Sequence, residues 1–93
     1  MTDRVLATDA LSVDPGLLAT LGSVEVGLWG MDPGTDHDTE VDEVFVVLAG
    51  SGTVTFEDGE VVELRPGVVV RLHAGERTTW VVTEALRKLY VAL

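Results

Sequence analysis

Valine accounts for 17 of the 93 residues, and the valines show almost no sustained helical period. Branching at Cβ restricts a side chain in a helix and suits the pleated surface of a sheet. Turn-forming pairs such as Asp58-Gly59 and Pro66-Gly67 separate apolar runs at intervals of about 8 to 12 residues. The pattern predicts an all-β chain of short strands that form a sandwich or barrel.

The expected elements follow the apolar runs. Asp14-Pro15, followed by three leucines and Gly22, favours a single helical turn. The acidic stretch 32–43, with six acids and no base, is expected to be mainly a solvated loop. The turn Gly50-Ser51-Gly52 is expected to separate two strands. The predicted strands are 23–30, 41–48, 53–56, 60–64, 68–72, 78–83 and 86–93, and residues 4–8 could add another.

Composition argues against several classes of function. The chain has 16 acids, 6 bases and a net charge of -10, which argues against nucleic acid and anionic membranes as partners. It has no cysteine, so disulfides, thiol nucleophiles and thiolate zinc sites are excluded. The N-terminus lacks a basic segment followed by a long apolar run, so we expect no signal peptide and no membrane span. We therefore expect a cytoplasmic location.

The charges are unevenly distributed along the chain. Residues 1–63 hold 14 acids and one base, whereas residues 64–93 hold two acids and five bases. We therefore expect the two stretches to attract each other in the fold.

Several predicted strands are apolar on both faces. The runs 44–48 and 68–70 do not alternate between apolar and polar residues. Only one face of a strand can point into a small barrel, so the other face needs a cover. A second copy of the chain is the simplest cover, and the sequence predicts a homodimer.

Two spaced motifs identify a family resemblance. Glu43 and Gly50 are separated by six residues ahead of an apolar strand. Pro66-Gly67 is followed by His73-Ala74-Gly75, and the run from Arg77 to Tyr90 completes the pattern. These features resemble the cupins, although His73 stands where their second motif has proline. The match is nearest to the subfamily that includes ureidoglycine aminohydrolase-type and ethanolamine-utilisation cupins.

The resemblance implies a fold and a division of the chain. Cupins are double-stranded β-helices, or jelly-roll barrels, so we expect a single domain of this kind. Residues 30–93 would form the cupin core. Residues 1–29 would be an N-terminal extension that completes the barrel or the dimer.

The resemblance also implies a position for a metal site. Cupin metals are commonly held by three histidines and one glutamate, and the matching positions here are His37, Thr39, Glu43 and Thr78. The two threonines are poor ligands, which leaves fewer protein ligands than catalytic zinc or facial-triad iron requires. His73 could complete a triad, although its place in a turn favours the rim. No cofactor is firmly expected, and a divalent metal (Zn, Fe, Mn or Ni) at His37 and Glu43 stays an alternative.

Side-chain alternation extends this site to a predicted ligand cavity. On an unbroken strand His37, Thr39 and Glu43 would all face the lumen. Glu43 is the strongest candidate, because a glutamate on an apolar inward strand is costly unless it is paired or functional. The predicted ligand-binding residues are Glu43, His37, Thr39, Phe45, Val47, Thr78 and Trp80. No catalytic residue is assigned.

Each of these predictions has a structural alternative. His37 would then be a loop histidine near carboxylates, and Glu43 would bond Arg71 or Arg77. Phe45, Trp80 and Trp29 would simply fill the core. Three functions remain open: a small-molecule-binding cupin with a degenerate metal site, a metal-dependent hydrolase of a ureide or amide, or isomerase, and a non-catalytic dimeric accessory protein.

Overall fold

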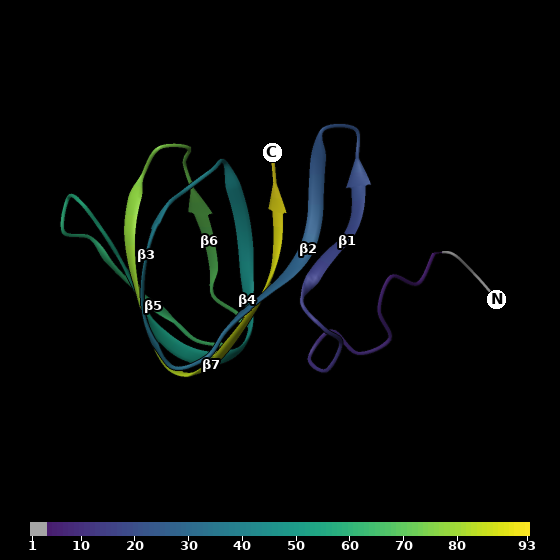
Figure 1. Ribbon diagram of the computed structural model, residues 1–93, viewed down its shortest axis with the longest axis horizontal. Helices are drawn as coiled ribbons and strands as arrows, with labels where there is room; N and C mark the ends of the chain where they lie inside the picture. Colours follow the sequence, from purple (N-terminus) through teal and green to yellow (C-terminus); the bar gives the residue numbers. More distant parts are fainter. Residues whose placement is uncertain (1–3) are drawn as a thin grey trace.

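The computed structural model describes residues 4–93, and the all-β prediction is confirmed. Its seven strands are β1 (Gly16–Leu21), β2 (Val24–Met31), β3 (Gly34–Thr39), β4 (Glu43–Phe56), β5 (Val61–Leu64), β6 (Val69–Leu72) and β7 (Arg77–Ala92) (Figure 1). No helix that could span a bilayer occurs in the described part of the chain.

Two long strands organise the sheet. The main strand order is β1-β2-β7-β4-β5, while β3 also pairs with β7 and β6 also pairs with β4. The first half of β7 lies beside β3, its second half lies beside β2, and β4 pairs along nearly its whole length. In Figure 1, β3 to β7 enclose the barrel, and the β1–β2 hairpin stands beside it. The site therefore depends on how β4 and β7 bend.

Glycine allows β4 to bend without ending. The ladder between β4 and β7 shifts register three times between Val47 and Gly52. Gly50 has φ 92°, and a Cβ added there would lie 2.2 Å from the carbonyl oxygen of Ala85. The expected turn at 50–52 is therefore wrong, because these residues form bulges within one strand. The two separate strands expected at 78–83 and 86–93 likewise form one continuous strand, β7.

The N-terminal predictions differ most from the structure. The expected helical turn after Pro15 is wrong, because Gly16–Leu21 forms β1 and pairs with β2. Pairing with a neighbouring strand has overridden the local helical spacing of the leucines. Residues 4–8 form no strand. Part of the acidic stretch is also a strand, since β3 pairs with β7 while all of its residues stay exposed.

The core lies between the inner faces of β4 to β7. Phe45 and Trp80 meet with ring centroids 5.7 Å apart, and Trp29 lies 5.5 Å from Trp80. Tilted aromatic pairs at this separation are favourable. The buried members of the cluster are Phe45, Val47, Val54, Leu64, Val70, Leu72, Trp80, Val82 and Leu86.

Ion pairs join the acidic and basic stretches, as their charges led us to expect. Arg71 Nη2 lies 2.9 Å from Asp42 Oδ1, and Lys88 Nζ lies 2.6 Å from Glu43 Oε2. The pairs connect Asp42, just before β4, and Glu43, the first residue of β4, with basic residues of the C-terminal stretch.

A row of valines covers the outer face of four neighbouring strands. Val44 pairs with Val91, which pairs with Val26, and Val46 pairs with Val69. Residues paired across strands share a face of the sheet, so these five side chains form one surface, here called the outer valine face. Val69 is 63% exposed, and Val44 and Val91 are each 40% exposed. The homodimer stays a prediction, and this face is the surface that it would bury.

We expect the homodimer to be lost when a charge is placed on the outer valine face. Val69→Glu would put a carboxylate into the apolar contact and shift the protein to monomer in size-exclusion chromatography with light scattering. Val61→Glu is the matched control, because Val61 is 56% exposed but lies on β5, outside this face. A wild-type protein that is monomeric at every concentration would contradict the prediction.

Candidate functional site

A pocket opens between β2, β7 and the segment that joins β3 to β4. Its volume is about 540 Å³. Binding sites usually carry few polar groups, but aromatic and charged side chains dominate the lining of this pocket. The aromatic side chains are Trp29, Trp80 and Tyr90, and the charged ones are the carboxylates Asp36, Asp38, Glu40 and Glu43 and the ammonium of Lys88.

At the inner end of the pocket, Lys88 and Glu43 form a buried ion pair. Lys88 is the single lysine of the sequence. Its Nζ lies 2.6 Å from Glu43 Oε2, and the two side chains are only 6% and 10% exposed. Nζ also lies 4.3 Å from the ring centroid of Phe45, 4.8 Å from Trp29 and 4.9 Å from Trp80. Both the carboxylate and the three ring faces stabilise the buried ammonium.

A second buried carboxylate, Glu40, is held in a fixed orientation. Thr78 Oγ1 donates a hydrogen bond of 2.5 Å to Glu40 Oε2, and Trp80 Nε1 donates one of 3.0 Å to the same oxygen. The backbone of Glu40 is also fixed, through bonds with Glu76 and Gly75. Among residues 4–93, Oε1 of Glu40 accepts no hydrogen bond, and the residue borders the pocket. This oxygen is available to a ligand.

The expected orientation of His37 is wrong. His37 pairs with Thr79 and is exposed, and its Nδ1 lies 3.1 Å from Thr79 Oγ1. The neighbouring Asp36 pairs with the inward Trp80, so the aspartates of β3, not the histidine, share the inner face. His37 and Glu43 do not share a face because β3 ends at Thr39 and the link before β4 breaks the alternation.

The other predicted ligand residues divide between the pocket and the core. Glu43, Trp80 and Thr39 line the pocket, with Thr39 exposed. Thr78 is buried and bonded to Glu40, whereas Phe45 and Val47 lie fully within the core. Core packing therefore fills the deeper part of the expected cavity.

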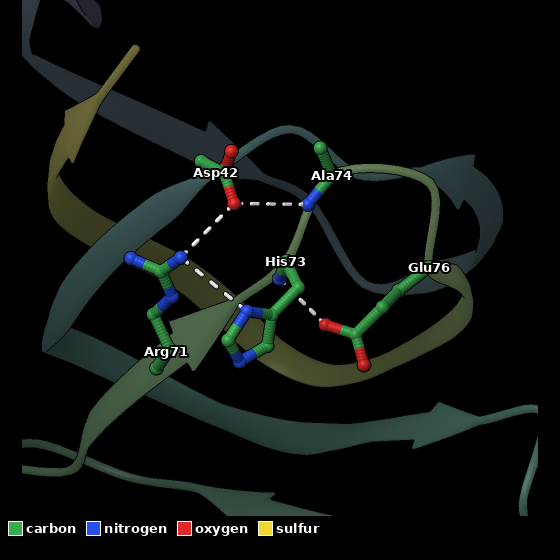
Figure 2. A network of polar contacts seen from close by, with 5 residues as sticks. All are labelled: Asp42, Arg71, His73, Ala74 and Glu76. Carbon is green, nitrogen blue, oxygen red and sulfur yellow. Dashed lines mark hydrogen bonds and ion pairs between the residues drawn. The ribbon is translucent and has the colours of Figure 1, made fainter.

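His73 lies at the surface, in the turn between β6 and β7. Arg71 Nη2 is 2.9 Å from Asp42 Oδ1 and 3.3 Å from His73 Nδ1 (Figure 2). The amide of Ala74 donates to Asp42 Oδ1, and the amide of His73 donates to Glu76 Oε1. His73 therefore belongs to a network that fixes the turn, outside the pocket.

The residues present do not fit the metal that a cupin barrel can hold. Within residues 4–93 no three histidine, aspartate or glutamate side chains are grouped as metal ligands. Glu43, the one carboxylate of the implied ligand set, is bonded to an ammonium whose charge opposes a divalent cation.

Sequence reasoning gave Lys88, Glu40 and Tyr90 no place in the site, and it considered Asp36 and Asp38 only as substitutes for missing metal ligands. The sequence could have indicated that Lys88 points inward, because it shares parity with Trp80 along β7 and is the single lysine of the chain. Tyr90 shares this parity, but alternation along β7 does not show what it contacts, because its surroundings depend on β2: a Cβ added at Gly27 would lie 2.5 Å from Tyr90 Oη.

The N-terminal segment supports one wall of the pocket. Pro15 and Gly16 line the pocket, and Arg87 Nη1 donates hydrogen bonds to the carbonyls of Ala10 and Val13. Within this segment Asp9 accepts hydrogen bonds from the Ser12 hydroxyl and the Leu11 amide, which lower the pKa of Asp9. The wall is thus attached to β7.

We expect Glu43→Gln to lower the free energy of unfolding by about 3–5 kcal/mol, because it leaves the Lys88 ammonium buried without a counter-charge. Urea denaturation measures this loss. Asp42→Asn is the matched control, since the Asp42–Arg71 pair is largely solvated, and we expect a change below about 1 kcal/mol.

A double variant completes the test. Glu43→Leu combined with Lys88→Met replaces both charges with apolar groups, and most of the stability should return. If Glu43→Gln and Asp42→Asn lowered the free energy of unfolding by equally small amounts, a structural role for the buried pair would be contradicted.

Comparisons with known proteins place the chain in a family. A search of curated proteins found no match. A solved protein of unknown function from Rhizobium leguminosarum is 30% identical with a TM-score of 0.78, and the match covers 99% of this chain and 95% of that one.

Two EutQ structures match over a smaller share of their own length. The putative ethanolamine utilization protein Q of Salmonella typhimurium is 30% identical (TM-score 0.66), with 75% of this chain and 57% of that one covered. The EutQ protein of Clostridium difficile shares the fold at 24% identity (TM-score 0.72), with 84% and 64% covered. This chain therefore spans less than two thirds of either EutQ protein.

The model of the EutQ-like cupin domain matches residues 18–90, which includes all of β2 to β6 and most of β1 and β7. The match, together with the antiparallel all-β architecture, confirms both the fold and the resemblance seen in the motifs. The chain belongs to the family of EutQ-like cupin domains.

Proposed function

We propose that this cupin binds a small organic cation with an apolar body, and that it does so without a divalent metal. The observation that carries the proposal is the charge of the pocket, whose lining combines four carboxylates with one ammonium. An anionic ligand would be repelled by this excess, whereas a cation would be attracted.

The carboxylates have different tasks. Glu43 is neutralised by Lys88, so Asp36, Asp38 and Glu40 remain to meet a ligand. Glu40 is already oriented by Thr78 and Trp80, and such preorganisation lowers the entropic cost of binding.

The aromatic part of the lining supports the same class of ligand. Trp29 and Tyr90 border the pocket beside the carboxylates and offer apolar faces. Such faces bind both an alkyl body and a cationic head group. The name of the Salmonella relative refers to ethanolamine utilization, and ethanolamine is a small organic cation at neutral pH. It is therefore a reasonable first probe.

We expect ethanolamine or choline to raise the melting temperature of the wild type, and ethylene glycol and glycolate, their neutral and anionic counterparts, to leave it unchanged. Calorimetric titration should show binding weakened about tenfold or more by Glu40→Gln, which removes a charged acceptor of similar shape.

Asp58→Asn is the control for this variant, because Asp58 lies in the exposed turn before β5, outside the pocket. Its affinity for the cations should equal that of the wild type. A pocket that prefers glycolate to ethanolamine, or a Glu40→Gln variant with unchanged affinity, would overturn the proposal.

One alternative has an observation in its favour. The outer valine face supports a non-catalytic accessory protein whose main property is to dimerise. A stable dimer that responds to no small cation in the same thermal assay would favour that function over ligand binding.

A further inference from the structure

We propose that the groups around the Lys88 ammonium form an ammonium-binding cage, and that the chain fills this cage with its own lysine. The cage consists of Glu43, Trp29, Phe45 and Trp80 and is here called the lysine cage. The inference goes beyond the proposed function, which concerns Asp36, Asp38 and Glu40, the pocket carboxylates that are not paired with Lys88.

The contacts of Lys88 are those of an ammonium recognition site. Its Nζ lies 2.6 Å from a carboxylate oxygen of Glu43 and between 4.3 and 4.9 Å from the centroids of three aromatic rings. Each ring distance is within the range of cation–π attraction, about 6 Å. Aromatic cages of this kind bind ammonium ligands, and here the bound ammonium belongs to the same chain.

The three rings of the cage are held together by contacts that do not involve Lys88. Trp80 packs against Trp29 at 5.5 Å and against Phe45 at 5.7 Å, and its Nε1 donates to Glu40 Oε2. Phe45 is only 1% exposed. The rings are therefore positioned by the core and by Glu40, and we expect them to keep their places when the lysine side chain is shortened.

The cage is also open to ligands from outside. Glu43, Trp29 and Trp80 all line the pocket, so a small amine that enters the pocket can reach the cage. In the wild type the tethered lysine has a high effective concentration and prevents free amines from binding there. It also occupies the Glu43 carboxylate, which is why this barrel lacks the free ligand that a metal would need.

The test is chemical rescue of Lys88→Ala with n-propylammonium, whose three carbon atoms and nitrogen match the atoms that the substitution removes beyond Cβ. Millimolar n-propylammonium should raise the melting temperature of Lys88→Ala by several degrees more than that of the wild type. 1-Propanol, which is neutral, and propionate, which is anionic, should not produce this additional shift.

A double variant assigns the rescue to the cage. In Lys88→Ala with Glu43→Gln the carboxylate is lost, so the additional shift should disappear. In the wild type Lys88 fills the cage, so its shift measures binding at Asp36, Asp38 and Glu40, and the loss of that shift in Glu40→Gln tests the proposed function separately. Rescue of Lys88→Ala by 1-propanol as strongly as by n-propylammonium, or no rescue at all, would overturn the cage.

The test also works if Lys88→Ala does not fold alone. The same three compounds are then present during refolding from urea, and near-ultraviolet circular dichroism reports the packing of the tryptophans. Recovery of the native signal with n-propylammonium alone supports the cage. Recovery with none of the compounds, or with all three, contradicts it.

Discussion

The buried pair of Lys88 and Glu43 is the interaction on which the rest of the site depends. It joins the second half of β7 to the first residue of β4, the two strands from which the barrel is built. Burying either charge alone would be strongly unfavourable, so the pair requires both strands to keep their register. The same ammonium is enclosed by three aromatic rings, which connects the ion pair to the hydrophobic core.

Two kinds of carboxylate result from this arrangement. Glu43 is bound internally and contributes to the stability of the fold, whereas Glu40 is oriented by Thr78 and Trp80 but has an oxygen available. The aspartates of β3 stay exposed at the mouth of the pocket. The internal cation and the acidic entrance are the basis of our proposal that the ligand is an organic cation, and among residues 4–93 no set of side chains is grouped to hold a divalent metal.

The candidate site was predictable only where alternation along a single strand decided it. Glu43 matches a cupin position that points inward, and Trp80 shares parity with Thr78, which matches another, so the resemblance and alternation together predicted their orientation. His37 lies on a different strand from Glu43, and the intervening residues break the count. Alternation along β7 also predicts that Lys88 points inward. Its role depends on the Glu43 carboxylate and the aromatic rings that lie around its ammonium, two of which come from other strands.

The sequence by itself determined the all-β class and the family, because valine-rich runs, turn residues and the spacing of Glu43 and Gly50 are local properties. It also determined that the acidic and basic stretches would pair. Only the tertiary structure decided that Gly50 bends a strand instead of ending it, and that residues 16–21 form a strand instead of a helical turn. Both depend on the neighbouring strand: β7 leaves no space for a Cβ at Gly50, and β2 supplies the hydrogen-bond partners of β1.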